Sequence, residues 1–392
     1  MPLIHDTARA FMPYPDAPVP RAATGPLAGL TMGVKDLFDV AGYPTSGGQP
    51  FVLAMSGIKT RTAATVQRLL DAGAVFAGKT ITDEFAFSMN GSNAHFGAPL
   101  NGNAPDRITG GSSSGSASAV SSRLVDFALG TDTGGSVRAP ASHCGLFGLR
   151  PTQGRVDLTG CMDLSPSFDT CGWFTRDIAT FDRVADILLG EDANPLPERV
   201  RLLRPEDVWA LLTPEAAQAF AAPFERVTRA LGSAAPVNVA LDAFDTMYWN
   251  FRYLQGREAW MTDGGTIERF QAPMGPGVGD RFAWAKEVTD AQVAEATAFR
   301  VRYTAHLKAL LGDDGVLVLP TMPDVAPLRS ESEGSLNDYR NAAIRMLCIA
   351  GLAGMPQLSM PLATRLGAPL GLSLLGPAGS DRSLVRLARR IV

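Results

Sequence analysis

GGSSSGSASAV (residues 110–120) and GTDTGGSVRAPASHCGLFGLRPT (residues 130–152) are two glycine-rich blocks within the stretch 109–152. Small residues over 117–123 favour a helix after the first block, and residues 124–130 have the composition of a strand. The turn TDTGGS (131–136) follows, and Val137–Pro140 is a plausible helix start. A flexible low-complexity linker is the alternative interpretation of the serine run. Patterned apolar segments on both sides favour an ordered core instead.

The sequence around this core alternates between strand and helix patterns. Residues 30–40 and 74–79 have the composition of buried strands, and residues 61–72 have helical spacing before Gly73. Further along, strands are predicted over 315–327 and 369–376, and helices over most of 195–236, over 291–311 and over 383–392. This order predicts the α/β class, with a central mixed sheet and helices on both faces. Because no repeat or linker interrupts the chain, residues 1–392 are expected to form a single domain after a lead-in over 1–25.

Composition excludes several classes of function. The 35 basic and 39 acidic residues give a net charge of −4 without a basic cluster, so no nucleic-acid partner is expected. No run of eighteen apolar residues is present, so no membrane partner is expected. The four cysteines have no C-x-x-C spacing, so neither a zinc site nor a disulfide framework is predicted. A reduced, cytoplasmic location is the expectation.

Ser136 is a candidate nucleophile. It follows Gly134 and Gly135, where backbone can approach a ligand closely and successive N–H groups form an anion-binding nest. Amide hydrolysis needs a nucleophile, a base and donors for the oxyanion, and this turn can supply the first and the last. The alternative is an ordinary turn in which Ser136 caps a helix.

Lys35 is a candidate base. It lies among Gly33, Val34, Leu37 and Phe38, where desolvation of the ammonium would lower its pKa and leave a neutral amine near pH 7. A lysine that snorkels from the end of a strand is the alternative.

Two other motifs occur in the sequence without the surroundings that their functions require. Gly111–Gly115 fits G-x-S-x-G, which would make Ser113 the nucleophile of an α/β-hydrolase, but neither His143 nor His306 has a distinctive context as its partner. Residues 73–80 fit the phosphate-loop pattern, yet a helix precedes them and a strand runs through them, which is the wrong order.

The two glycine-rich blocks resemble the core of the amidase signature family. Further matches extend over most of the chain. They comprise GVKDLFDVAG (33–42), TDEFAFSMNGSNAHFGAP (82–99), SFDTCGWFTRD (167–177), LPTMPDVAP (319–327), AGMP (353–356) and PLGLSLLG (369–376). The resemblance is weakest across 190–310, a variable helical region that is expected to shape the substrate site. Within the family, residues 82–99 and the short lead before Lys35 are most similar to the short plant-type indole-3-acetamide amidases. The resemblance implies a single-domain amidase signature fold.

The resemblance also implies a Ser-Ser-Lys triad. Its nucleophile is Ser136, its bridging serine is Ser112, with a cis peptide bond there, and its base is Lys35. Backbone N–H groups around Thr133, Gly134 and Gly135 would form the oxyanion hole, and the charged pair Asp132 and Arg138 would order the loop. The expected reaction converts a carboxamide to a carboxylate and ammonia through an acyl-enzyme, without a metal or an organic cofactor. An esterase, the glutamine-hydrolysing subunit of a tRNA amidotransferase and a non-catalytic binding module of the same fold are the alternatives.

The substrate is expected to be a small amide, such as a primary amide or an aryl-acetamide. Met89, Asn90, Phe168 and Thr170 are the candidate substrate-binding residues. An aromatic wall is a further possibility, formed by Trp249, Phe251, Tyr253 and Trp260; the alternative for these four is ordinary core packing. A homodimer is the default expectation for assembly, as the commonest soluble oligomer.

Overall fold

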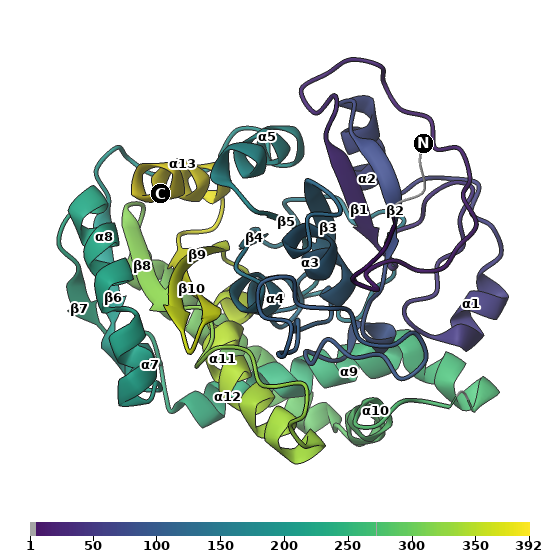
Figure 1. Ribbon diagram of the computed structural model, residues 1–392. Helices are drawn as coiled ribbons and strands as arrows, with labels where there is room; N and C mark the ends of the chain where they lie inside the picture. Colours follow the sequence, from purple (N-terminus) through teal and green to yellow (C-terminus); the bar gives the residue numbers. More distant parts are fainter. Residues whose placement is uncertain (1–4, 272) are drawn as a thin grey trace.

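The computed structural model describes residues 5–271 and 273–392, so residues 1–4 of the expected lead-in lie outside the described residues. Ten strands of the described chain form one sheet, in the order β2-β1-β3-β5-β4-β9-β10-β8-β6-β7 (Figure 1). Their bounds are β1 Thr31–Lys35, β2 Val75–Thr80, β3 Phe127–Thr131, β4 Phe147–Arg150, β5 Cys171–Thr175, β6 Arg201–Pro205, β7 Ala235–Val237, β8 Gly315–Pro320, β9 Gln357–Arg365 and β10 Ala368–Leu375.

The sheet is mixed, as the sequence predicted. β1 is parallel to both of its neighbours, β2 and β3. From β3 to β8 every adjacent pair is antiparallel, and β8, β6 and β7 are again parallel. Parallel neighbours need long crossover connections, and helices supply them at the β1 end.

Helices connect and cover the strands. Their bounds are α1 Pro50–Ser56, α2 Ala64–Asp71, α3 Ser114–Ser121, α4 Arg138–His143, α5 Ile178–Leu188, α6 Glu206–Trp209, α7 Pro214–Ala219, α8 Ala221–Leu231, α9 Phe244–Phe270, α10 Val278–Lys286, α11 Asp290–Leu311, α12 Glu333–Ala353 and α13 Asp381–Ile391, with a 3₁₀ turn over Glu84–Ala86. None of the described helices combines the length and the apolar composition of a membrane span.

Alternating side chains of the central strands divide the core between the two faces of the sheet. On β3, Phe127 and Leu129 belong to the large core, which includes residues of α5 and α13. Ala128, between them, belongs to a smaller core with residues of α3 and α4. Since successive strand residues point to opposite faces, helices cover both faces, which confirms the predicted α/β class.

The helices α9, α10, α11 and α12 gather along one side of the molecule, at the bottom of the view in Figure 1. The local sequence defines their ends. A capping box between Thr289 and Gln292 begins α11, and Gly312 follows its last residue. Ser332 caps α12, which ends at Gly354 in the left-handed conformation.

Three parts of the chain differ from the pattern that the sequence predicted. The strand expected over 315–327 ends at Pro320. The strand expected over 30–40 ends at Lys35, and the next residues turn away from the sheet. The stretch 195–236, predicted to be mostly helical, also contains β6 and β7. β6 pairs with β8, and β7 is a short edge strand in which Pro236 is tolerated, so tertiary pairing overrides weak local preference there.

Candidate active site

Lys35 is the last residue of β1, and its side chain is fully buried. Its ammonium nitrogen Nζ donates hydrogen bonds to Ser112 Oγ and to Thr131 Oγ1, each at 2.8 Å. Burial lowers the pKa of Lys35 to about 8, against the opposing charge of Asp83. A neutral amine is therefore accessible at physiological pH. Sequence reasoning missed Thr131, although this residue lies within the second glycine-rich block.

Ser112 lies in the loop before α3, and the Gly111–Ser112 peptide bond is cis. The Ser112 carbonyl accepts hydrogen bonds from the Asp83 backbone N–H and from the Thr82 hydroxyl, both at 3.0 Å. Its hydroxyl accepts from Lys35. Backbone contacts thus fix the loop while the side chain stays in contact with the lysine.

Ser136 lies in the loop between β3 and α4 and is 6% exposed. Its carbonyl accepts a hydrogen bond of 3.3 Å from the N–H of Ser113, the neighbour of Ser112. The two serine loops are therefore joined through their backbones. The structure brings the three residues expected in a triad to one buried region.

The backbone amides around Ser136 do not all have the same partners. The Gly135 N–H donates to Asp132 Oδ1 at 2.9 Å, so this amide already has an acceptor. Within the described chain, the amides of Thr133, Gly134 and Ser136 have no protein acceptor. Of the three residues expected to form the oxyanion hole, Thr133 and Gly134 keep a free donor.

Asp132 is the centre of a buried charge network. Its carboxylate accepts from Arg138 Nε at 3.0 Å and Nη2 at 2.8 Å, and from Arg150 Nη1 at 3.3 Å. It also accepts the backbone N–H groups of Val137 and Arg138. Burial alone would raise the pKa of Asp132, but the two guanidinium groups hold it well below its usual range. The pair Asp132 and Arg138 thus ties the serine loop to the start of α4.

Arg150 was missed by sequence reasoning although it lies in the second block. It donates to the carbonyls of Asp132 at 2.7 Å, Thr133 at 3.1 Å and Phe168 at 2.9 Å. A fully buried arginine that binds successive loop carbonyls fixes the path of the backbone beside Ser136.

Replacing Asp132 by asparagine is expected to lower the free energy of unfolding by about 3–5 kcal/mol, because Arg138 and Arg150 would be left as buried cations without their anion. Urea denaturation measures the change. The matched control is Glu225→Gln, which breaks an exposed pair with Arg229 and should change the free energy by less than about 0.5 kcal/mol. Equal effects of the two substitutions would contradict the role given to Asp132.

A small cavity of about 10 Å³, enough for roughly one water molecule, borders Ser136. Its lining comprises Ala86, Phe87, Ser88, Met89, Gly134, Ser136, Phe251, Gln255, Arg340 and Ile344. We call it the serine cavity.

Of the four residues expected to bind substrate, the structure places Met89 on the serine cavity. The other three are not among its lining residues. The Asn90 amide N–H donates to Ser88 Oγ, Phe168 packs edge-on against Phe251 at 5.0 Å, and the Thr170 hydroxyl donates to the Asp132 carbonyl.

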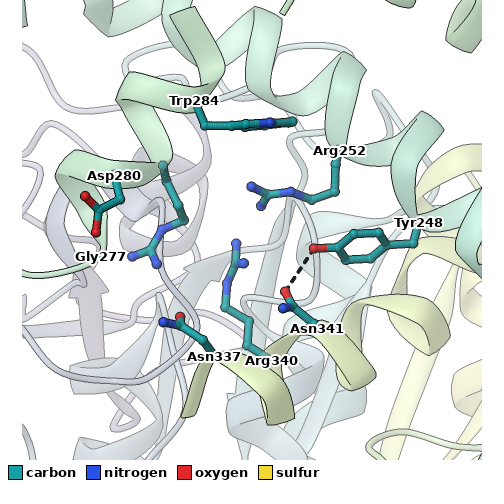
Figure 2. Close-up of a pocket in the computed structure, with 9 residues that line it drawn as sticks. Tyr248, Arg252, Gly277, Asp280, Trp284, Asn337, Arg340 and Asn341 are labelled. Atoms are coloured by element: carbon teal, nitrogen blue, oxygen red, sulfur yellow. Dashed lines mark hydrogen bonds between the residues drawn. The ribbon is translucent and has the colours of Figure 1, made fainter. Parts of the chain in front are cut away.

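A larger cavity lies next to the serine cavity, and Arg340 lines both (Figure 2). We call it the arginine cavity. Its lining comprises Tyr248, Arg252, Gly277, Asp280, Arg281, Trp284, Asn337, Arg340 and Asn341. Sequence reasoning missed all of these residues, because three separate helices, α9, α10 and α12, contribute most of them.

The alternative chemistries find less support in the geometry. The hydroxyl of Ser113 donates to the Thr131 carbonyl, and His143 Nε2 contacts the Tyr339 hydroxyl at 2.9 Å, so neither faces the other as in a serine–histidine pair. Lys79 lies within β2 and forms a buried ion pair with Asp36 at 2.7 Å, which is incompatible with a phosphate loop. Among the described residues, no three histidine, cysteine or acidic side chains come together as metal ligands.

Comparison with known proteins gives one consistent family. The Amidase family model matches residues 3–385. Amidase 1 of Arabidopsis thaliana is 39% identical over 391 aligned residues, with 92% of each chain covered. The chloroplastic outer envelope protein 64 of the same plant is 32% identical. The match covers 95% of this chain and 67% of that protein. A crystal structure of an amidase superposes with a TM-score of 0.83 at 30% identity, covering 94% of this chain and 85% of its own. The fold, the assembled serine loops and these matches agree: the chain belongs to the amidase family.

Proposed function

We propose that this amidase hydrolyses primary carboxamides with Ser136 as nucleophile, Ser112 as proton relay and Lys35 as base. The observation that carries the proposal is the hydrogen bond of 2.8 Å between Lys35 Nζ and Ser112 Oγ, in a fully buried setting beside the Ser136 loop. A lysine that pairs with a serine hydroxyl instead of a carboxylate is suited to proton transfer.

The proposed reaction proceeds as follows. Neutral Lys35 takes the Ser112 hydroxyl proton while Ser112 takes the proton of Ser136, whose Oγ attacks the carbonyl carbon. The amides of Thr133, Gly134 and Ser136 are the donors available to the oxyanion, since the Gly135 N–H is already bonded to Asp132. The relay then returns the proton to the leaving nitrogen, the C–N bond breaks and ammonia leaves. Water enters, loses a proton to the same relay and releases the carboxylate from Ser136.

The value of kcat/KM should rise with pH and reach half of its plateau near pH 8, because the reaction needs the neutral form of Lys35. Below this pKa the amine is protonated and cannot act as a base. Thr131→Val removes a hydroxyl that accepts a hydrogen bond from the ammonium form, so it should move the midpoint to lower pH. Ammonia release between pH 6 and 10 measures both profiles. A profile that is flat over this range would exclude Lys35 as the base.

The test of the proposed function is capture of the acyl-enzyme. The protein is mixed with a panel of amides and with the p-nitrophenyl esters of the same acids, quenched in acid within the first turnover, and its intact mass is measured. We expect a covalent acyl adduct on the peptide that contains Ser136. An adduct mapped to Ser113 or Ser112 would overturn the assignment. Turnover of esters without any amide would favour an esterase.

For the acyl group, the aromatic wall that the sequence suggested is incomplete. Of its four residues, Phe251 lines the serine cavity. Trp249 is 44% exposed and stacks with Tyr253. Indole-3-acetamide therefore belongs in the panel as one candidate among several.

A further inference from the structure

Three buried arginines are concentrated in the arginine cavity. Its volume of about 290 Å³ is near the lower end of the range of small-molecule sites, roughly 300–1,000 Å³. Arg252 comes from α9, Arg281 from α10 and Arg340 from α12. Their exposed fractions are 6%, 8% and 7%, so each is more than nine-tenths buried. Figure 2 shows Arg252 and Arg340 extending into the same space, with the Trp284 ring beside Arg252.

These cations lack anionic partners within the described part of the protein. None of the three forms an ion pair with a described carboxylate. Arg252 Nε and Nη1 and Arg340 Nε are buried without a hydrogen-bond acceptor. Arg281 Nε donates to the neutral Phe87 carbonyl at 2.6 Å.

The charge balance of the cavity is strongly positive. Asp280 is the one acidic residue of its lining, and it is exposed to solvent. The charge of Asp83 acts on Arg281 more strongly than the charges of Glu333 and Asp280. Asp83 is buried, and burial raises its pKa, which favours its neutral form. Glu333 is exposed. Burial and mutual repulsion lower the pKa of Arg281 and Arg340. Buried charges in proteins are normally paired, and a cluster of like charges without counter-ions costs folding free energy. An anion bound among them would remove this cost.

The arginine cavity and the serine cavity share part of their walls. Arg340 lines both cavities, and Phe87, which lines the serine cavity, accepts the Arg281 hydrogen bond. On α9, Phe251 and Gln255 line the serine cavity, while Tyr248 and Arg252 line the arginine cavity. A ligand that occupied both cavities would place its charged end among the arginines and its other end beside Ser136.

We infer that the arginine cavity binds a carboxylate on the acyl part of the substrate, so that the enzyme acts on primary amides that carry a carboxylate, such as monoamides of dicarboxylic acids. This inference rests on the proposed function for the position of the reacting carbonyl. Guanidinium groups match the planar carboxylate with two parallel hydrogen bonds. The carboxylate takes no part in the chemistry: water adds, the amide C–N bond breaks, and ammonia and a dicarboxylate leave.

Matched pairs of amides test the inference. Succinamate, glutaramate and 4-carbamoylbenzoate are compared with butyramide, valeramide and 4-methylbenzamide, which have the same framework without the charge; a phosphonate analogue of succinamate tests whether another oxyanion serves. We expect kcat/KM to be about 10- to 100-fold higher for the best acid than for its neutral partner, as for hydrogen bonds to a charged group. Arg340→Gln and Arg252→Gln should each remove most of this preference, because kcat/KM should fall more for the acids than for their neutral partners.

The control is Arg269→Gln, which removes an exposed arginine of α9 outside the cavity and should leave the preference unchanged. Titration calorimetry of succinamate with Ser136→Ala separates this inference from the proposed function, since binding does not require turnover. Binding that Arg340→Gln abolishes would support the arginine cavity even if no amide were hydrolysed. Equal kcat/KM for charged and neutral partners, or a preference that survives both substitutions, would overturn the inference, as would a preference confined to the phosphonate.

Discussion

Ser136→Ala is expected to lower kcat for amide hydrolysis by about 10⁴-fold or more, because the proposed mechanism has no other nucleophile. The substitution removes one hydroxyl from a residue that is 6% exposed. It leaves the backbone hydrogen bond from the Ser113 N–H to the Ser136 carbonyl in place. The fold should therefore persist, with circular dichroism and the thermal midpoint close to those of the parent. Ammonia release from the preferred amide, measured with the parent at matched concentration, gives the ratio.

Ser113→Ala is the control that separates the two serine hypotheses. In the elbow motif Ser113 would be the nucleophile, whereas its hydroxyl here is bonded to the backbone of Thr131. Loss of these two bonds should reduce kcat by less than about tenfold. If Ser113→Ala were inactive and Ser136→Ala active, the nucleophile assignment would be wrong.

The candidate residues that the sequence singled out are the ones that stand in short motifs. Ser112 and Ser136 stand next to paired glycines, and Lys35 is a lone cation in an apolar strand. Such features are local in the sequence, so they can be recognised without knowledge of the fold. The strands β1, β2 and β3 around them were also predicted, from their local apolar pattern and from the glycines near their ends.

Other parts of the site depend on contacts between distant segments. Arg138 Nη1 donates to Gln357 Oε1, 219 positions away. Arg340 lines the serine cavity, although it lies far from Ser136 in the sequence. No spacing rule connects such residues, so their roles appear only when the helices pack. The Gly135 amide shows a subtler case: the glycine motif predicts a free donor, but the Asp132 carboxylate occupies it. Likewise β6 pairs with the edge that β8 offers, and β7 pairs with β6, which the sequence of 195–236 does not reveal.

Two buried lysines give a prediction that separates catalysis from stability. Lys35 and Lys79 are both nearly inaccessible to solvent, on neighbouring strands β1 and β2. Lys79 pairs with the carboxylate of Asp36 at 2.7 Å, whereas Lys35 contacts two hydroxyl groups. Burial lowers the pKa of both lysines, and in Lys79 the charge of Asp36 opposes this effect.

Lys35→Met is expected to lower kcat by about 10²–10⁴-fold, the usual contribution of a general base. Most substitutions of buried residues lower the free energy of unfolding, but this one is expected not to lower it. The folded pKa of Lys35, about 8, is below that of the unfolded chain, so at pH 7 the protonated amine opposes folding. Methionine removes this cost and fills a similar volume. The free energy of unfolding in urea at pH 7 should stay constant or rise.

Lys79→Met should show the reverse pattern. It leaves Asp36 as a buried carboxylate without its cation, which typically costs about 3–5 kcal/mol of unfolding free energy. Hydrogen bonds from the Tyr14 hydroxyl and the Ser46 amide still reach Asp36, so the fold should survive at low temperature. Activity per folded molecule should then stay within about tenfold of the parent, since Lys79 has no contact with the serine loops. A stable, inactive Lys79→Met, or an active Lys35→Met, would mean that the base is not the lysine beside Ser112, and the ion-paired lysine of β2 would have to be reconsidered.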